Sequence, residues 1–160
     1  MPSRTNARLE LTPAGRLEEA QLHQVLGYQL AQARIVTDAL FADHVGVPFG
    51  LRPVEFTVLT LISENPGGSL ARIARALAVT APNVTAVVDR LEAKGWIERA
   101  QSSKDRRSQV LHTTVRGAAL VRDATCRILQ AEREALALTP GEQAMLVELL
   151  HKVACARPAG

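Results

Sequence analysis

Apolar residues recur at helical spacing along most of this chain of 160 residues. Between residues 17 and 45 they fall every three or four positions, a pattern that predicts one long amphipathic helix. Upstream, Thr12 followed by Pro13 resembles a helix start, because Thr can cap a helix and Pro fits the first helical position. Residues 46–50, which include Pro48, are expected to end the long helix.

Shorter helices follow in the middle of the chain, each with a start or stop signal. Residues 52–64 are largely apolar and predict a helix that an Asn-Pro-Gly-Gly turn ends. Ser69 is placed to cap a helix over residues 70–77. Thr80 is placed to cap the next helix, which runs to Gly95, a residue that readily takes the left-handed conformation at a helix end.

A hairpin and two more helices complete the pattern. Residues 96–99 and 109–113 read as strands, and the polar segment 102–107 lies between them. Thr114 is placed to cap a second long helix, and residues 139–142 (Thr-Pro-Gly-Glu) form a capping box for the last one. The predicted fold class is mainly α, with a winged helix-turn-helix formed by the central helices and the hairpin. The outer helices have apolar faces but no core of their own.

Charge is concentrated in the winged helix-turn-helix. The net charge is +3, but residues 70–116 contain nine Lys or Arg and four Asp or Glu, which leaves the rest of the chain at −2. Such a basic excess in a reading motif favours a double-stranded DNA partner. Hydrophobic residues make up 47% of the chain, enough for a packed core. No apolar run approaches the ~20 residues that span a membrane, and the N-terminus has no secretory signal, so we expect a cytoplasmic protein with no membrane partner.

The helix after Thr80 is the predicted reading helix. In a helix-turn-helix the second helix enters the major groove, and its first residues meet base edges. Asn83 can contact adenine through two hydrogen bonds, and Thr85 can bond a base or touch a thymine methyl group. Arg90 and Lys94 lie later, where phosphate contact is expected. The predicted DNA-binding residues of this helix are Thr80, Ala81, Pro82, Asn83, Thr85, Ala86 and Arg90.

The hairpin supplies the second part of the predicted DNA-binding surface. Lys104 and Arg106 are the residues expected at the tip, where they would reach phosphates and the narrow minor groove, and Arg107 lies beside them. Asp105 is expected to orient Arg107 through charge-assisted hydrogen bonds. Asp89 on the reading helix could pair with a wing arginine in the same way.

These residues resemble the MarR (multiple antibiotic resistance regulator) family of transcription factors. The run DRLEAKGWIER followed by DRRSQVLHTT is similar to the family's reading helix and wing. The wing pattern is matched by Asp105, Arg107, Leu111 and Thr114. Two positions depart from it: Thr113 stands where Leu is usual, and Ser102-Ser103 stands where Asp-Pro is common.

The resemblance implies how the chain is organised. Family members pair their outer helices in a dimerisation domain below two winged-helix lobes, and a two-fold dimer would read a pseudo-palindromic operator. A homodimer would also bury the unaccompanied apolar faces. The expected parts are a mobile N-terminal arm (1–16), a dimerisation helix (17–50), the winged helix-turn-helix lobe (51–114) and C-terminal dimerisation helices (115–155).

The resemblance also implies a small aromatic effector, phenolic or carboxylate, that releases DNA. The candidate pocket residues are Tyr28, Arg34, Phe49, Arg52 and Phe56. Arg34 could hold a carboxylate with its guanidinium, or it could pair with Asp38 four residues on. The three aromatic residues could equally belong to the core.

Other functional classes find little support in the residues. No nucleophile elbow, phosphate loop or metal-binding motif is present, so we expect no enzyme, no cofactor and no metal site. Cys126 and Cys155 are expected to be small buried apolar residues on helices, with a redox switch or an inter-subunit disulfide as alternatives. Two alternatives to an effector-controlled repressor stay open: an activator without an effector, and a winged-helix module that binds protein.

Overall fold

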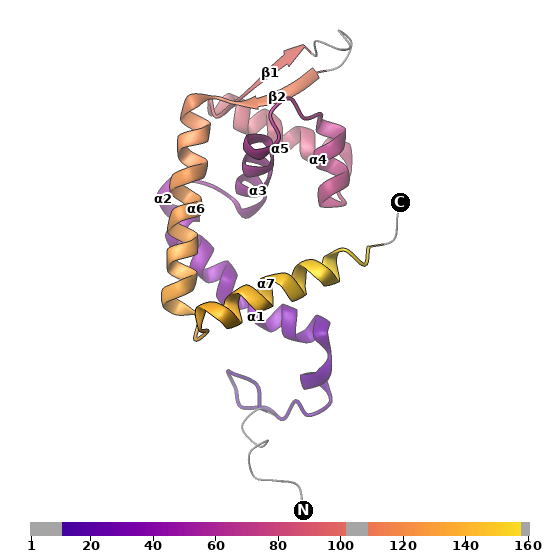
Figure 1. The fold of residues 1–160 in the computed structure, drawn as a ribbon, viewed down its shortest axis with the longest axis vertical. Helices are drawn as coiled ribbons and strands as arrows, with labels where there is room; N and C mark the ends of the chain where they lie inside the picture. Colours follow the sequence, from indigo (N-terminus) through magenta and orange to yellow (C-terminus); the bar gives the residue numbers. More distant parts are fainter. Residues whose placement is uncertain (1–10, 102–108, 158–160) are drawn as a thin grey trace, which may run out of the picture. The chain divides into compact units, whose positions relative to one another are not determined.

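A computed structural model describes residues 11–101 and 109–157 of the chain. These residues separate into two compact units, one ending at Leu40 and the other beginning at Phe41. Figure 1 shows the order of the helices and the single hairpin along the chain. The predicted class, mainly helical with a small β-hairpin, is confirmed.

The described part of the first unit has a turn in place of the predicted helix start. Leu11 pairs with Glu18 in an isolated antiparallel bridge. The hydroxyl of Thr12 accepts the N–H of Leu17 at 2.9 Å, so this threonine closes a turn and does not cap a helix. The prediction of a helix start at Thr12 and Pro13 is therefore wrong, because a side chain that could cap a helix can equally close a local turn.

The long helix begins later than residue 17. A short 3₁₀ helix, η1 (Leu22–Gln24), comes before helix α1 (Leu26–Phe41). In the segment between residue 17 and η1, the carboxylate of Glu19 accepts the hydroxyl proton of Tyr28 at 2.6 Å. This segment is thus tied to the first turns of α1 through side chains instead of extending the helix.

The same helix also ends later than predicted. It continues through a π turn, η2 (Ala42–Gly46), into the short helix α2 (Val47–Phe49). Only at Gly50, where φ is 61°, does the chain leave the helical conformation. Pro48 does not break the helix because it lies in the first turn of α2, where the N–H that proline lacks would have no partner within that helix. The preceding π turn has already shifted the hydrogen-bonding register.

After η2 and α2, the second unit contains the predicted winged helix-turn-helix and two longer helices. The helices and strands begin and end within a few residues of the predicted positions, and their order is confirmed. They are α3 (Pro53–Glu64), α4 (Leu70–Leu77), α5 (Ala81–Ala93), β1 (Ile97–Gln101), β2 (Gln109–Thr113), α6 (Val115–Ala135) and α7 (Pro140–Ala154).

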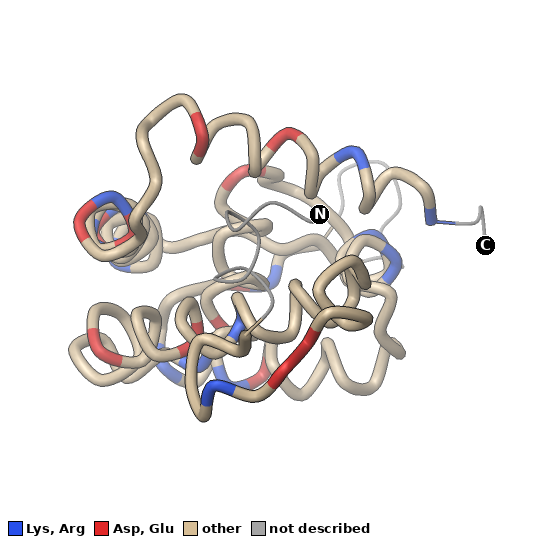
Figure 2. The backbone as a smooth tube through the Cα atoms, turned by 90° about the horizontal axis from the view of Figure 1, so that it is seen from below, with Lys and Arg blue, Asp and Glu red and all other residues tan. Residues whose placement is uncertain are grey.

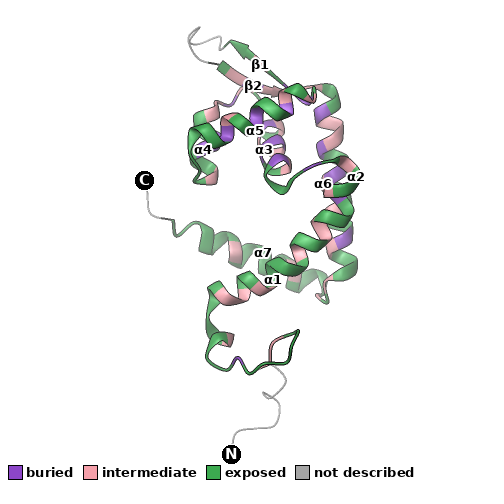
Figure 3. Ribbon diagram, turned by 180° about the vertical axis from the view of Figure 1, so that it is seen from behind, coloured by how far each residue is buried: buried purple, intermediate pink, exposed green. Residues whose placement is uncertain are grey.

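The core of the second unit lies where α3, α4, α5, the hairpin and the first half of α6 meet. Figure 3 shows the buried positions concentrated in these elements. Large apolar side chains that are fully buried there are Val58, Leu59, Ile62, Val84, Val88, Leu91 and Leu111. Full burial of one such side chain stabilises the fold by about 1.5–3 kcal/mol, so this cluster is what holds α5 and the hairpin in place.

In the second unit, the helix caps agree with the sequence at three positions and differ at one. Ser69, Thr114 and Thr139 each accept the N–H three residues on, as predicted. Thr80 is the N-cap residue of α5, but its side chain makes no cap hydrogen bond. The N–H three residues on, which the other three caps bind, belongs here to Asn83 and donates to the main-chain carbonyl oxygen of Thr80 at 3.1 Å.

The hairpin is joined to α6 by a very close approach of backbones. The strands pair in register from Ile97 with Thr113 to Gln101 with Gln109. Thr114 donates its N–H to the carbonyl oxygen of Trp96 at 3.0 Å, and Gly117 in the first turn of α6 lies against the same carbonyl group. A Cβ atom on Gly117 would overlap that oxygen, so only glycine fits here.

No single helix in the described part of the chain is both long and apolar enough to cross a membrane. The stretch Leu26–Phe49 and helix α3 meet the length and composition criteria only when the two are taken together.

Candidate DNA-binding interface

Helix α5 has one face in the core and one face in solvent. Val84, Val87, Val88 and Leu91 recur at three- and four-residue spacing and are buried. At the end of the helix, Gly95 adopts a φ of 70° and donates its N–H to the carbonyl oxygen of Glu92, which is the left-handed stop that the sequence predicts. Because the inner face of α5 is packed in the core, the opposite face points to solvent.

The predicted reading residues lie on that outer face. Ala81, Pro82, Asn83 and Ala86 are exposed, and the two alanines leave room for a close approach. Thr85 is half-buried, and its hydroxyl donates to the carbonyl oxygen of Ala81 at 3.0 Å. Thr85 thus keeps only its acceptor lone pairs and its methyl group for a partner.

Arg90 is already engaged within the protein. Its Nε donates to Oε1 of Glu55 at 3.0 Å, an ion pair that the sequence reasoning missed. Lys94, also expected at a phosphate, donates to Oε2 of the same carboxylate at 3.2 Å and to the carbonyl oxygen of Gly50 at 3.1 Å. Both side chains still have substantial solvent exposure, so any phosphate contact would have to be made from these anchored positions.

Glu55 is a buried carboxylate with a low pKa. Only 2% of its surface is exposed. Burial raises the pKa of Glu55, but hydrogen bonds from the N–H of Arg52 and from the side chains of Arg90 and Lys94 outweigh burial, and the net pKa falls below the ordinary 4.5. The group is therefore ionised at neutral pH, and it joins α3 to the C-terminal half of α5.

The hairpin is fixed to α5 by a second charge cluster. Arg99 on β1 bonds the carboxylate of Asp89 and that of Glu92, the latter at 2.7 Å. A contact between Asp89 and a wing arginine was expected, and Arg99 is the arginine that makes it. Arg99 is only 24% exposed, so this cluster lies between the helix and the strand. It links α5 to the first strand of the wing.

The predicted wing tip lies outside the described residues. This applies to Lys104, Asp105, Arg106 and Arg107, whose roles stay predictions.

Helix α4 adds two basic residues that the sequence reasoning missed. Arg72 and Arg75 are both exposed on this helix, which is the first of the helix-turn-helix pair. In that motif the first helix crosses the DNA backbone, so exposed arginines three residues apart are candidate phosphate contacts. Their spacing within the run LARIARAL was the signal available in the sequence.

A hollow lies between α5 and the helices α3 and α4. It has a volume of about 350 Å³, and its apolar lining comes from α3, the end of α4, the turn before α5 and the inner face of α5 itself. Asn83 and Arg90 form its polar rim, and Ala86 lies between them. The predicted reading amide and the Arg90 guanidinium therefore open onto one concave surface.

The candidate effector residues fall in both units. In the first unit, the Tyr28 hydroxyl donates to Glu19, and this hydrogen bond is the main cause of a raised Tyr28 pKa. Arg34 pairs with Asp38 at 3.0 Å, which is the alternative that the sequence left open.

In the second unit, Phe56 packs against Phe41 with ring centroids 5.6 Å apart. The ring of Phe49 is covered by the guanidinium of Arg127 at 5.1 Å. Both rings thus belong to the border of the core, the other interpretation that the sequence allowed. Arg52 is exposed at the start of α3. A pocket formed by the five candidate residues stays a prediction.

The outer helices expose their apolar side chains in the single chain. On α1, Leu26, Ile35 and Val36 are each about half exposed or more, and α7 has no buried residue at all. In Figure 2 most of α7, the helix that leads to the C-terminus, is free of charged residues. Such surfaces are rare on proteins that act alone and mark interaction sites.

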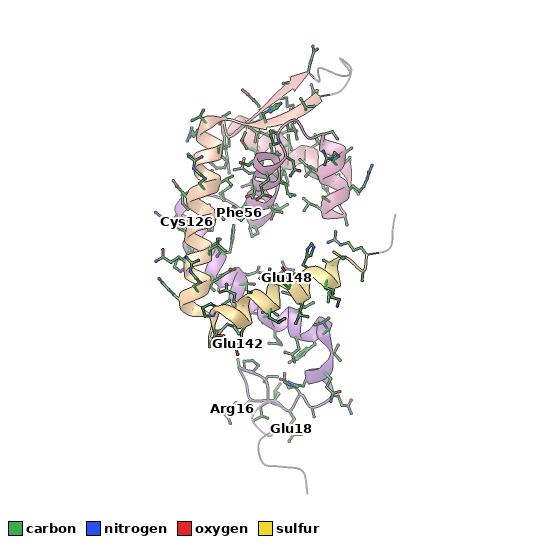
Figure 4. All side chains as sticks on the ribbon, in the orientation of Figure 1. Arg16, Glu18, Phe56, Cys126, Glu142 and Glu148 are labelled. Carbon is green, nitrogen blue, oxygen red and sulfur yellow. The ribbon has the colours of Figure 1, made fainter. Side chains whose placement is uncertain are left out.

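Both cysteines are exposed in the single chain, so the prediction that they are buried is wrong for this state. Cys126 lies on α6 (Figure 4), and Leu129 on the same helix is also exposed. Cys155 directly follows the last residue of α7, where its sulfur lies 3.6 Å from Nε2 of His151. The sequence placed both cysteines on helices, and Cys155 in fact lies one position after the end of α7. Periodicity could not show which helix faces stay exposed in a single subunit.

Comparison with known proteins points to one family. The model of the MarR family matches residues 51–109. The chain is 33% identical over 129 residues to a putative transcriptional regulatory protein for the hcr operon of Thauera aromatica, and the match covers 80% of this chain and 78% of that protein.

Solved structures have the same fold. The chain is similar to the transcriptional repressor CouR bound to a 23-mer DNA duplex, with a TM-score of 0.77 and 32% identity over 86% of this chain and 98% of that one. It is also similar to Bordetella bronchiseptica BpsR, whose DNA binding is regulated by 6-hydroxynicotinic acid. There the TM-score is 0.73 and the identity 26%, over 84% of this chain and 96% of that one.

Proposed function

This chain belongs to the MarR family of transcriptional regulators, and we propose that it acts as a homodimeric repressor that a small aromatic compound releases from a pseudo-palindromic operator. The observation that carries the proposal is the outer face of α5, where Asn83 and small residues are exposed beside a hairpin held by Arg99. A repressor of similar fold bound to a DNA duplex supports the same use of this surface.

In the proposed complex α5 lies in the major groove. Asn83 reads an adenine, and Thr85 offers its methyl group to a thymine, because its hydroxyl proton is engaged by the backbone. Arg72 and Arg75 of α4 contact the phosphates, and Lys104, Arg106 and Arg107 of the wing reach the backbone and the minor groove. The protein works in the cytoplasm, where its operator lies.

Dimer formation is supported by the exposed apolar stripe on α7. Leu146, Leu149, Leu150 and Val153 follow the i, i+3, i+4, i+7 spacing of one helix face, and they are exposed or half-buried in the single chain. A second copy would bury these faces together with those of α1. It would also set two reading helices about one helical turn of DNA apart, as a pseudo-palindrome requires.

The effector is supported by a relative, BpsR, whose DNA binding responds to 6-hydroxynicotinic acid. The proposed effector contacts are Tyr28, Arg34, Phe49, Arg52 and Phe56. An aromatic carboxylate would have to compete with Asp38 for the Arg34 guanidinium. An activator without an effector, or a module that binds protein, is the alternative.

Selection of duplexes from a random 25-base-pair pool tests the proposal. The wild-type chain should enrich a pseudo-palindromic sequence, and its affinity for that duplex should fall steeply and linearly with the logarithm of salt concentration. No enrichment, or a flat salt response, would contradict DNA binding and favour the protein-binding alternative.

Two substitutions separate base reading from backbone binding. Asn83→Ala should relax the preference at one base position, with a loss of about 1–3 kcal/mol on the selected duplex only. Arg106→Ala should instead weaken binding to selected and random duplexes alike. Circular dichroism of both variants serves as the folding control.

A further inference from the structure

Two glutamates of this chain occupy the same position in the same local motif. Glu55 in α3 and Glu142 in α7 are each the third residue of a helix that begins with proline. Each accepts the N–H of the residue before that proline, at 3.2 Å from Arg52 and at 2.7 Å from Thr139. Capping therefore explains both carboxylates equally well.

Of the two, only Glu55 has partners beyond its own helix among residues 11–101 and 109–157. Oε1 accepts from Nε of Arg90 at 3.0 Å, and Oε2 accepts from Nζ of Lys94 at 3.2 Å. Lys94 is itself held on three sides, because Nζ also donates to Gly50 and lies 4.6 Å from the centre of the Trp96 ring. Glu142, by contrast, is exposed and bonds only within its cap.

The geometry leaves part of Arg90 available. Glu55 engages Nε, and the two terminal amino groups of the guanidinium are not used in that bond. Arg90 lines the hollow beside Asn83 and is 42% exposed. The guanidinium is thus held through Nε, and the side chain that carries it lines the same hollow as Asn83.

We propose that Glu55 is a positioning residue for DNA recognition, which holds Arg90 in a preset orientation so that its terminal amino groups bind the operator backbone. Glu55 is too deeply buried to contact DNA itself. This inference rests on the proposed DNA-binding function, and it identifies Glu55 as a residue that sets the affinity for DNA. Holding the side chain beforehand reduces the ordering cost on binding, because a free arginine loses most of its rotamer freedom when it is fixed.

The expected loss of DNA affinity in Glu55→Gln follows from the number of arginine side chains that the substitution leaves without their anchor. Ordering one flexible side chain corresponds to about a twofold to tenfold change in affinity. A dimer of Glu55→Gln would release two arginines, so it should bind the selected duplex about fivefold to a hundredfold more weakly. Lys94 keeps its bond to Gly50 in that variant and should contribute little.

The test uses the duplex that the wild-type chain selects and four full-length variants. Glu55→Gln and Arg90→Gln are compared alone and combined, and Glu142→Gln is the matched control, since glutamine also suits a capping box. Affinities are measured below the melting temperature of every variant. Arg90→Gln should weaken binding and lower the salt slope by about 1 for each phosphate that the variant no longer binds.

The combined variant decides the question. If Glu55 acts through Arg90, the double variant should bind no more weakly than Arg90→Gln, and Glu142→Gln should bind like wild type. Additive reductions in affinity, or an Arg90→Gln variant with wild-type affinity and salt slope, would overturn the inference while leaving DNA binding in place. Failure of the wild-type chain to select any duplex would instead overturn the proposed function.

A second variant keeps the test decisive if Glu55→Gln does not fold. Arg90→Lys retains the charge but has a single terminal amino group, which cannot bond Glu55 and a phosphate with fixed geometry. It should retain the wild-type salt slope and still bind more weakly. Wild-type affinity in Arg90→Lys would overturn the positioning role.

Discussion

Replacement of Leu149 by aspartate should convert the protein to a monomer. Leu149 lies in the middle of the α7 apolar stripe and is 51% exposed in the single chain. Burial of a whole leucine side chain is worth about 1.5–3 kcal/mol, so burial of the exposed half in two protomers contributes a similar total of about 1.5–3 kcal/mol. Removal of that burial alone raises the dimer dissociation constant by roughly tenfold to a hundredfold.

The introduced aspartate destabilises the dimer further. A carboxylate forced into an apolar interface costs several kcal/mol more unless it finds a partner. Leu149→Asp should therefore be largely monomeric at micromolar concentration, while its helix content stays unchanged because α7 contributes no buried residue to the subunit core. Sedimentation equilibrium measures the dissociation constant, and circular dichroism checks the fold.

The adjacent residue provides the matched control. Glu148→Asp places the same carboxylate one position away, at a site that is already acidic (Figure 4), and should leave the dimer intact. If Leu149→Asp formed a dimer as stable as that of Glu148→Asp, the stripe on α7 would not be the dimer interface. Monomeric Leu149→Asp should also lose the preference for two half-sites over one.

Other substitutions test the lobe. Gly117→Ala should destabilise the protein by several kcal/mol in chemical denaturation, because its Cβ would overlap the Trp96 carbonyl group; wild-type stability would show that α6 can shift at no cost. Arg99→Gln should loosen the hairpin against α5, with weaker operator binding and a loss of up to about 1 kcal/mol in stability, because both carboxylates are more than a third exposed; unchanged values for both would contradict a role for Asp89 in orienting the wing. Because the folded-state pKa of Glu55 is lowered, its contribution to stability is complete above pH 4.5 and is lost as pH falls through the lower folded value. The free energy of unfolding should therefore fall less steeply with decreasing pH in Glu55→Gln than in wild type. An equally steep fall would contradict a lowered pKa of Glu55.

Much of the fold was readable because its signals are local. Ser69, Thr114 and Thr139 bond N–H groups only three residues away, and Gly95 ends α5 through its own backbone freedom. The buried stripe of α5 is likewise a property of one helix. Where two local outcomes compete, the sequence was less decisive: Thr12 closes a turn although it could have capped a helix.

The sequence by itself determined the order of the elements, most of the helix caps, the inner and outer faces of α5 and the family resemblance, because these depend on contacts within a few residues. Tertiary structure alone decided which charges meet. Glu55 lies 35 residues before Arg90 and 39 before Lys94. The sequence contains many other Lys and Arg residues, and nothing in its pattern singles out these two as the partners. The fold also selected Arg99 as the partner of Asp89, because a strand that pairs in a set register can bring only certain side chains against a helix. Pairing between side chains far apart in the sequence depends on how the core packs. The spacing of apolar residues along the chain carries no information on that packing.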